Sequence, residues 1–100
     1  MKEAYRYKFD PSIPFEDIEA SLLLAMLSAE SIHGESQVRL DASHVIDAEA
    51  HACVIDANTA VGRDLNRLFT GFIRREFGEG LFRVKRVEAV TPSELAGAVA

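Results

Sequence analysis

NTAVGRDLNRLFTGFIRREFG, residues 58–78, is the stretch of this chain that decides the fold. With about 100° between successive residues, as in an α-helix, its large apolar side chains share one stripe: Val61, Leu65, Leu68, Phe69 and Phe72. The opposite side carries Arg63, Arg67, Thr70 and Arg74. Asn58 or Thr59 can cap the start of the helix, and Gly78 can adopt the left-handed conformation that ends it. Gly71, inside the helix, permits the close approach of a neighbouring element. The stretch therefore predicts an amphipathic helix that lies on a flat apolar partner.

The composition is that of one soluble globular domain, with 48% hydrophobic and 27% charged residues in a chain of 100. The formal net charge of -5 disfavours nonspecific binding to nucleic acid. The single cysteine, Cys53, excludes an internal disulfide and favours a reducing compartment. Residues 1–10 lack the apolar run of a secretion signal, and the longest apolar run, residues 22–27, is far too short to cross a bilayer. We therefore expect a cytoplasmic protein without a membrane segment.

A second amphipathic helix is predicted over residues 14–32, with Pro14 at its first position and Gly34 as its end. Its main stripe consists of Phe15, Ile18, Leu22, Ala25, Met26, Ala29 and Ile32. Three further leucines, Leu23, Leu24 and Leu27, lie outside this stripe, so the apolar surface is wider than one sheet face requires. We expect part of this surface to touch the other helix and the remainder to form a subunit contact.

Period-two alternation predicts the strands. In residues 4–9, Tyr5, Tyr7 and Phe9 share one side, and residues 81–87 alternate in the same way. Residues 37–46 and 51–57 predict a hairpin with residues 47–50 at its tip and Ile46 opposite His51. That register directs one set of side chains toward the helices: Leu40, Ala42, His44, Ile46, His51, Cys53 and Ile55.

The resulting order is strand, helix, strand, strand, helix, strand. Two right-handed crossovers then interlock into a four-stranded antiparallel sheet with both helices on one face. We therefore expect an α+β ferredoxin-like sandwich over residues 1–90, followed by a loosely held tail over residues 91–100. Residues 54–57, running into residues 59–78, resemble small uncharacterised bacterial proteins of this fold. The resemblance implies no activity and no cofactor, and a single cysteine does not support an iron–sulfur cluster.

His44, His51 and Cys53 are candidate metal ligands. The expected register places His44 directly across from Cys53, with His51 on the same face. Imidazole and thiolate are suitable zinc ligands, although a fourth ligand or water is also needed. The alternative is a small buried thiol with two histidines near the rim of the hairpin.

A basic surface is expected on the sheet face away from the helices, formed by Arg6, Lys8, Arg39, Arg83 and Lys85. RNA-binding domains with this strand order place aromatic rings on the central strands, but HACVIDA, residues 51–57, contains none. Turning the first strand over would expose Tyr5 and Tyr7 but would bury Arg6 and Lys8, which is costly. Nucleic-acid binding is therefore not expected.

No catalytic signature is present, and an enzyme is the least supported reading. The first hypothesis is a noncatalytic binding or scaffold domain that forms a homodimer through Leu23, Leu24 and Leu27. The basic side of residues 58–78 and an acidic outer side of the first helix could also meet across a two-fold axis. The alternative hypothesis is a small-molecule-sensing regulatory domain. Its ligand would sit near Asp56, Asn58 and Thr59, where free backbone amides at a helix start can hold an anion.

Overall fold

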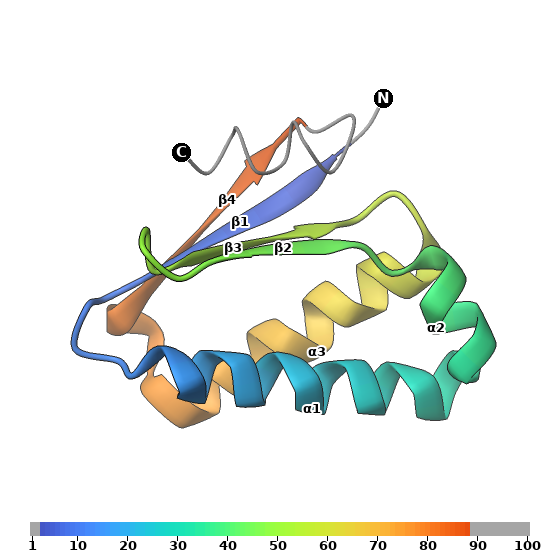
Figure 1. The fold of residues 1–100 in the computed structure, drawn as a ribbon, viewed down its shortest axis with the longest axis horizontal. Helices are drawn as coiled ribbons and strands as arrows, with labels where there is room; N and C mark the ends of the chain where they lie inside the picture. The colour runs from blue at the N-terminus through green and yellow to red at the C-terminus, as the bar shows by residue number, and fades with distance from the viewer. Residues whose placement is uncertain (1–2, 89–100) are drawn as a thin grey trace.

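The computed structural model describes residues 3–88, which form an α+β domain with a four-stranded antiparallel sheet and helices on one face (Figure 1). The strand order is β2-β3-β1-β4. The strands are β1 Ala4–Phe9, β2 His44–Asp47, β3 Ala52–Asp56 and β4 Phe82–Val87. The helices are α1 Phe15–His33, α2 Glu35–Asp41 and α3 Ala60–Phe77, and a 3-10 turn, η1, covers Glu79–Leu81. The tail expected over residues 91–100 lies outside the described residues.

Helix α3 forms where its local chemistry predicts. The Thr59 hydroxyl accepts a hydrogen bond from the Gly62 amide at 2.9 Å and so caps the start of the helix. Gly78 ends the helix with a φ of 79°, which favours glycine, and its amide bonds the Arg74 carbonyl at 3.0 Å. Val61, Leu65 and Phe69 are buried as expected, and Ile73 extends the buried stripe. Leu68 and Phe72 lie on its flank and are half-buried.

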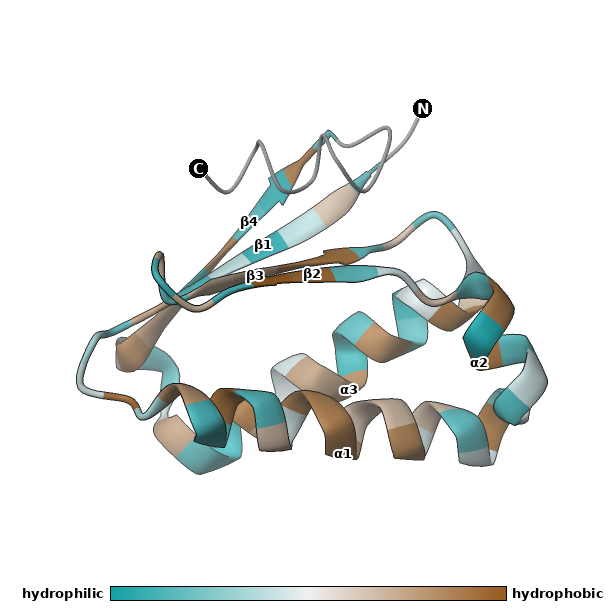
Figure 2. Ribbon diagram, viewed as in Figure 1, coloured by the Kyte–Doolittle hydropathy of each residue, from teal (hydrophilic) through white to brown (hydrophobic). Residues whose placement is uncertain are grey.

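The main core lies between the sheet and helices α1 and α3. Tyr7 and Phe9, from the aromatic side of β1, point toward the helices as predicted and contact Phe69 edge-on, with ring centroids 4.9 and 6.2 Å apart. Helix α1 contributes Ile18, Leu22 and Ala25. Figure 2 shows hydrophobic residues recurring along α1 and in β2 and β3. A second, smaller buried cluster on the opposite sheet face comprises Ala4, Ala52 and Val54.

The predicted strand over residues 37–46 is wrong in its first half, which forms α2. Gly34, with a φ of 89°, breaks the chain direction after α1, and Glu35 then pairs with Arg39 one helical turn away at 2.7 Å. Val38 is the buried residue of α2 and packs with Ala29 and Val61. Arg39 therefore lies on a helix and not on the sheet face where we expected it.

Two further expectations about the apolar side chains near α2 are also wrong. Ile32 is 61% exposed, because Val38 fills the end of the core that Ile32 was expected to cover. Leu40 is 79% exposed on α2 instead of facing the helices from a strand. At the other end of α1, Pro14 is the residue before the helix rather than its first helical residue.

The hairpin register differs from the prediction by two residues. His44 pairs with Ile55, and Ile46 pairs with Cys53. The turn has to include His51, whose φ of 54° lies in the left-handed region, so His51 cannot sit in the ladder opposite Ile46. Because side chains alternate with a period of two, this displacement keeps every strand residue on the face we expected. Cys53 and Ile55 are accordingly in the main core.

Along residues 3–88, no helix combines the length and the apolar character that crossing a bilayer requires.

Candidate functional site

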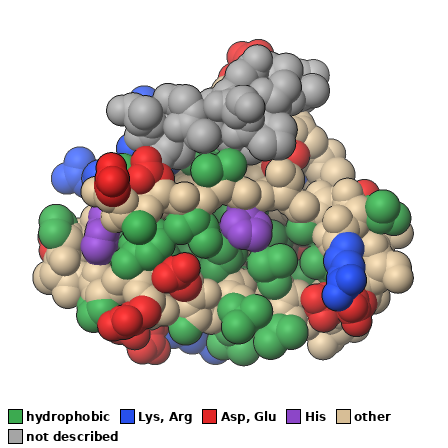
Figure 3. All heavy atoms as spheres, viewed as in Figure 1, with side chains coloured by type: hydrophobic (Ala, Val, Ile, Leu, Met, Phe, Trp, Pro, Cys, Tyr) green, Lys and Arg blue, Asp and Glu red, His purple; other side chains and the backbone are tan. Residues whose placement is uncertain are grey.

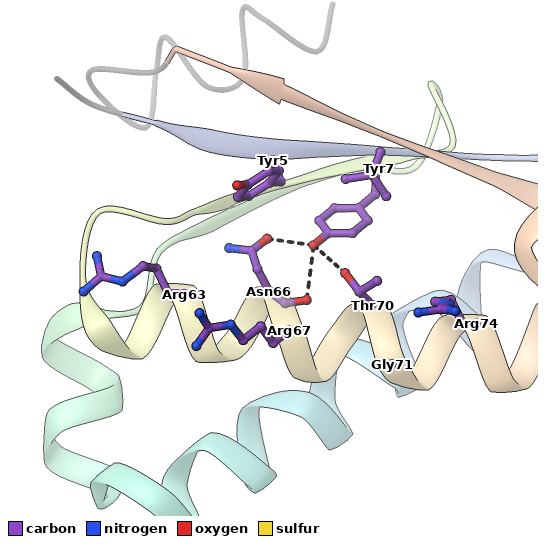
Figure 4. A pocket seen from close by; sticks show the side chains of 9 residues that line it. Tyr5, Tyr7, Arg63, Asn66, Arg67, Thr70, Gly71 and Arg74 are labelled. Carbon is purple, nitrogen blue, oxygen red and sulfur yellow. Dashed lines mark hydrogen bonds between the residues drawn. The ribbon is translucent and has the colours of Figure 1, made fainter.

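The candidate site is an open groove between the sheet and one side of α3 (Figure 4). It has a volume of about 450 Å³, in the range of ligand-binding clefts. Its lining residues are Tyr5, Tyr7, Arg63, Asn66, Arg67, Thr70, Gly71, Arg74 and Val84. In Figure 4 the tyrosines hang from β1 while the three arginines extend from α3 at successive points along the helix.

The groove exists because β4 is an edge strand that α3 does not fully cover. Val84 pairs with Tyr7 in the ladder, so both side chains point toward the helix layer. Tyr7 is 1% exposed, but Val84, one strand further out, is 42% exposed. Gly71 widens the space, since a Cβ added there would meet no atom within 4 Å. The close approach that we expected at Gly71 is therefore wrong.

The close approach occurs instead at Gly62, at the start of α3. A Cβ added there would overlap the carbonyl oxygen of Asp56. Only glycine lets the first turn of α3 lie against the end of β3, and this contact places the whole helix relative to the sheet.

The inner wall of the groove is a buried hydrogen-bond network. The Tyr7 hydroxyl donates to Asn66 Oδ1 at 2.7 Å and lies 3.1 Å from the Thr70 hydroxyl. Asn66 Nδ2 donates to the carbonyls of Gly62 at 2.8 Å and Asp56 at 3.2 Å. Burial raises the pKa of Tyr7 well above its ordinary value, so the phenol stays protonated. These groups join β1, the end of β3 and α3, and their role in the groove is structural.

The outer rim of the groove is cationic. Arg67 Nη1 lies 3.2 Å from Asp64 Oδ1, and Arg74 Nη2 lies 2.6 Å from Glu79 Oε1. These two arginine side chains are 78% and 57% exposed, so water weakens both ion pairs. For Arg63, no carboxylate within residues 3–88 is at ion-pair distance. The groove therefore suits an anionic ligand.

Asp64 is held mainly by groups other than the groove arginines. Its Oδ2 lies 2.8 Å from His33 Nε2, and this hydrogen bond, followed by the contact with Arg67, holds the pKa of the carboxyl below its ordinary value. The ion pair also joins the end of α1 to α3. One oxygen of Asp64, Oδ2, therefore contacts His33, and only the other oxygen, Oδ1, contacts Arg67.

The predicted metal ligands do not lie as the expected register placed them. Cys53 has Ile46 across from it instead of His44, and the expected pairing is therefore wrong. The Cys53 thiol is buried, which raises its pKa to about 12. His51 Nε2 donates to the Ile13 carbonyl at 2.6 Å, and its ring meets Phe15 edge-on. Within residues 3–88, no three His, Cys, Asp or Glu side chains are grouped so that they could hold a metal ion.

The predicted anion site at the start of α3 is occupied by the chain's own groups. Asp56 Oδ1 accepts hydrogen bonds from the backbone amide of Asn58 at 2.7 Å and from its side chain at 2.6 Å. The Thr59 hydroxyl donates to the Asp41 carbonyl at 3.0 Å, and Asn58 Oδ1 accepts from the Glu3 amide at 2.9 Å. These bonds explain the local conformation, and small-molecule binding at Asp56, Asn58 and Thr59 stays a prediction.

The leucines proposed as a subunit contact are all exposed. Leu23 is 58%, Leu24 50% and Leu27 51% accessible. Ile46, on the edge strand β2 and facing the helix layer, is 38% exposed. Figure 3, which looks onto α1 and β2, shows apolar side chains gathered across this face.

Sequence reasoning recognised the arginines of the groove but not the groove itself. The row Arg63, Arg67 and Arg74 followed from helical spacing, and we interpreted it as a possible contact with an acidic helix. The missing step was geometric: the predicted strand order already places the last strand at an edge, where its helix-facing residues lack full cover. Asn66 was not predicted as part of the site, because the sequence does not show which groups a polar residue of this helix will bond. Comparisons of this chain with family models, with curated proteins and with solved structures found no match.

Proposed function

We propose that this protein is a noncatalytic scaffold domain that forms a homodimer through the side of the molecule made by α1 and β2. The observation that carries the proposal is the exposure of Leu23, Leu24 and Leu27, each half or more accessible on one helix. A soluble monomer rarely leaves a contiguous apolar patch uncovered, and such a patch usually marks an interface.

The architecture supports the same proposal. We infer that the order β2-β3-β1-β4, with α1 and α3 on one face, is a ferredoxin-like sandwich to which the short helix α2 has been added. In this arrangement β2 is an edge strand beside α1. Ile46 of β2 and the α1 leucines can then be covered together by the same surface of a second copy. The reduced, buried Cys53 fits a cytoplasmic setting.

Sedimentation equilibrium or light scattering over a range of protein concentrations tests the proposal. The parent chain should have the mass of a dimer, and Leu23→Glu combined with Leu27→Glu should have the mass of a monomer, because charge would be placed in an apolar contact. Circular dichroism should show the same helix content in both proteins.

The matched control is Ile32→Glu. Ile32 is 61% exposed on the same helix, but around the helix axis it lies about 180° from Leu23 and about 140° from Leu27, the two substituted leucines. This variant should remain dimeric. A parent chain that is monomeric at every concentration, or a leucine double variant that stays dimeric, would refute the proposal.

A further inference from the structure

The outer edge of β4 and the groove beneath it form a second surface, separate from the α1–β2 side. In the sheet formed by residues 3–88, β4 pairs with β1 on one side and with no strand on the other. An unpaired edge offers a row of backbone donors and acceptors to an incoming strand. Immediately below this edge, Val84 and the arginines of α3 line the groove.

The charged side chains of β4 itself are all cationic, although Arg86 Nε lies 3.0 Å from Glu3 Oε2. Arg83, Lys85 and Arg86 lie in β4, whose sequence FRVKRV contains no acidic residue. Arg83 and Lys85 are exposed on the face away from the helices, whereas Arg67 and Arg74 stand on the helix side, in the groove. A segment lying along β4 would therefore meet cations on both of its faces.

The length of the groove favours an extended occupant. Arg63 and Arg74 are eleven residues apart on α3, which corresponds to about 16 Å of helix. A strand of about five residues covers the same distance. A single phosphate or small carboxylate would engage only one part of this row.

The β4 strand of a second copy is a poor occupant of the β4 edge. Antiparallel pairing of two β4 strands would bring the cations Arg83, Lys85 and Arg86 of one copy against the same residues of the other. Like charges placed opposite one another destabilise a sheet pairing. The cationic edge of β4 therefore disfavours pairing with a second β4 strand and favours pairing with an acidic strand.

We propose that the β4 edge, together with the α3 groove, binds an extended acidic segment of a partner protein by strand addition. Main-chain hydrogen bonds to β4 hold the segment. Because successive side chains of a strand point to opposite faces, acidic side chains on one face reach Arg67 and Arg74, and acidic side chains on the other face reach Arg83 and Lys85. On the groove face, an apolar side chain between two acidic ones covers Val84. This proposal goes beyond self-association, and its test gives a clear answer whether the chain is a monomer or a dimer.

The test uses a labelled synthetic decapeptide of glutamate with valine at every fourth position, which places both valines on one face of a strand and glutamates on both faces. The peptide is titrated with the full chain and followed by fluorescence polarisation. The lysine–valine peptide, which has the same sequence with lysine in place of glutamate, should not bind. Arg67→Glu combined with Arg74→Glu should weaken binding of the acidic peptide by roughly tenfold or more, and added salt should also weaken it. Arg75→Glu reverses one charge on the same helix outside the groove lining, and it should bind almost as well as the parent, whereas Arg67→Glu or Arg74→Glu alone should already weaken binding.

Two further readouts keep the result decisive. Because the double variant has its groove charge reversed, it should gain affinity for the lysine–valine peptide, a change that simple unfolding would not produce. Bound acidic peptide should also slow amide hydrogen exchange in β4 but not in β2. Equal binding of the parent and the double variant would overturn the proposal.

Other ligands would leave different signatures. Inorganic phosphate or glutarate that displaces the peptide fully, with no added protection of β4, would mean an anion site on α3 alone and would overturn strand addition. An oligothymidylate that binds more tightly than the acidic peptide would mean a nucleic-acid surface and would overturn the assignment to a protein partner.

Discussion

Tyr7 and Asn66, on β1 and α3, share a buried hydrogen bond of 2.7 Å from the phenol to the amide oxygen. Asn66 is 6% exposed and Tyr7 is 1% exposed, so both polar groups lie within the core. The amide nitrogen of Asn66 bonds carbonyls at the end of β3 and in α3, so a single residue fixes the position of α3 against two strands. Packing holds the two layers together, while this bond sets their alignment.

Tyr7→Phe should lower the free energy of unfolding by about 1–3 kcal/mol, because it leaves the buried Asn66 oxygen with a weaker set of partners. Urea denaturation measures the change. Tyr5→Phe is the matched control on the same side of β1: its hydroxyl makes no hydrogen bond to residues 3–88, and the variant should be nearly as stable as the parent. Equal losses in the two variants would contradict a specific role for the Tyr7 hydroxyl.

Gly62→Ala and Gly71→Ala should change stability in opposite directions. The first adds a methyl group that overlaps the Asp56 carbonyl and should destabilise the fold by roughly 1–3 kcal/mol, despite the better helix propensity of alanine. The second adds a methyl group in open space and should stabilise α3 by about 0.5–1 kcal/mol. Thermal unfolding of both variants checks the sign. A stabilised Gly62→Ala would mean that α3 moves freely relative to β3.

Phe69→Ala should cost about 3–5 kcal/mol, since Phe69 is fully buried against Tyr7 and Phe9 and its removal leaves a cavity. Arg67→Ala, two residues earlier and exposed, should change stability by less than about 1 kcal/mol. Urea midpoints measured under the same conditions give both values. A small effect of Phe69→Ala would place the core elsewhere.

His44 should make the fold less stable as the pH falls. Burial lowers the pKa of His44 from its ordinary value of 6.5, so below that value the unfolded chain binds a proton more readily than the native one. Unfolding then becomes easier as the pH falls from about 7.5 to about 5.5. His44→Gln should remove this part of the pH dependence and leave the later loss that arises when Asp64 becomes protonated. An unchanged slope in the variant would count against a half-buried, neutral imidazole at His44.

Cys53 should be unreactive in the native protein. Its thiol is 1% exposed and burial raises its pKa to about 12, so at pH 8 almost no thiolate is available to attack a reagent. Labelling by a disulfide reagent should proceed only as the chain unfolds and should accelerate with added urea. Fast labelling without denaturant would indicate that β3 opens locally.

The helix α3 and the helix-facing side of β1 could be predicted because local chemistry decides them. Thr59 and Gly78 are residue types that cap helices. In β1, the aromatic side chains face the helices, because the reverse orientation would bury the charged Arg6 and Lys8 at a high cost in free energy. The α+β class, the antiparallel sheet and the helices on one face follow from these elements.

The errors arose where tertiary contacts choose between local options. Residues 35–41 alternate weakly, but the spacing of Glu35 and Arg39 suits a helix equally well, and the burial of Val38 against Ala29 selects it. The hairpin register depends on the left-handed conformation of His51. Residues other than glycine adopt this conformation infrequently, so the sequence does not predict it here. The groove depends on how far Val84 projects beyond α3, a distance that no local pattern encodes.

The positive charge of β4 has a consequence for how many copies can join. A sheet that can add strands at both of its edges can keep growing as further copies join. An edge strand that repels the same strand of another copy prevents growth by pairing at that edge. FRVKRV supplies such a stop at one end of this sheet. If two copies meet through their β2 edges, only the two repelling β4 edges remain free. The assembly then stops at two copies, and the protein can become concentrated in a cell without polymerising into fibres.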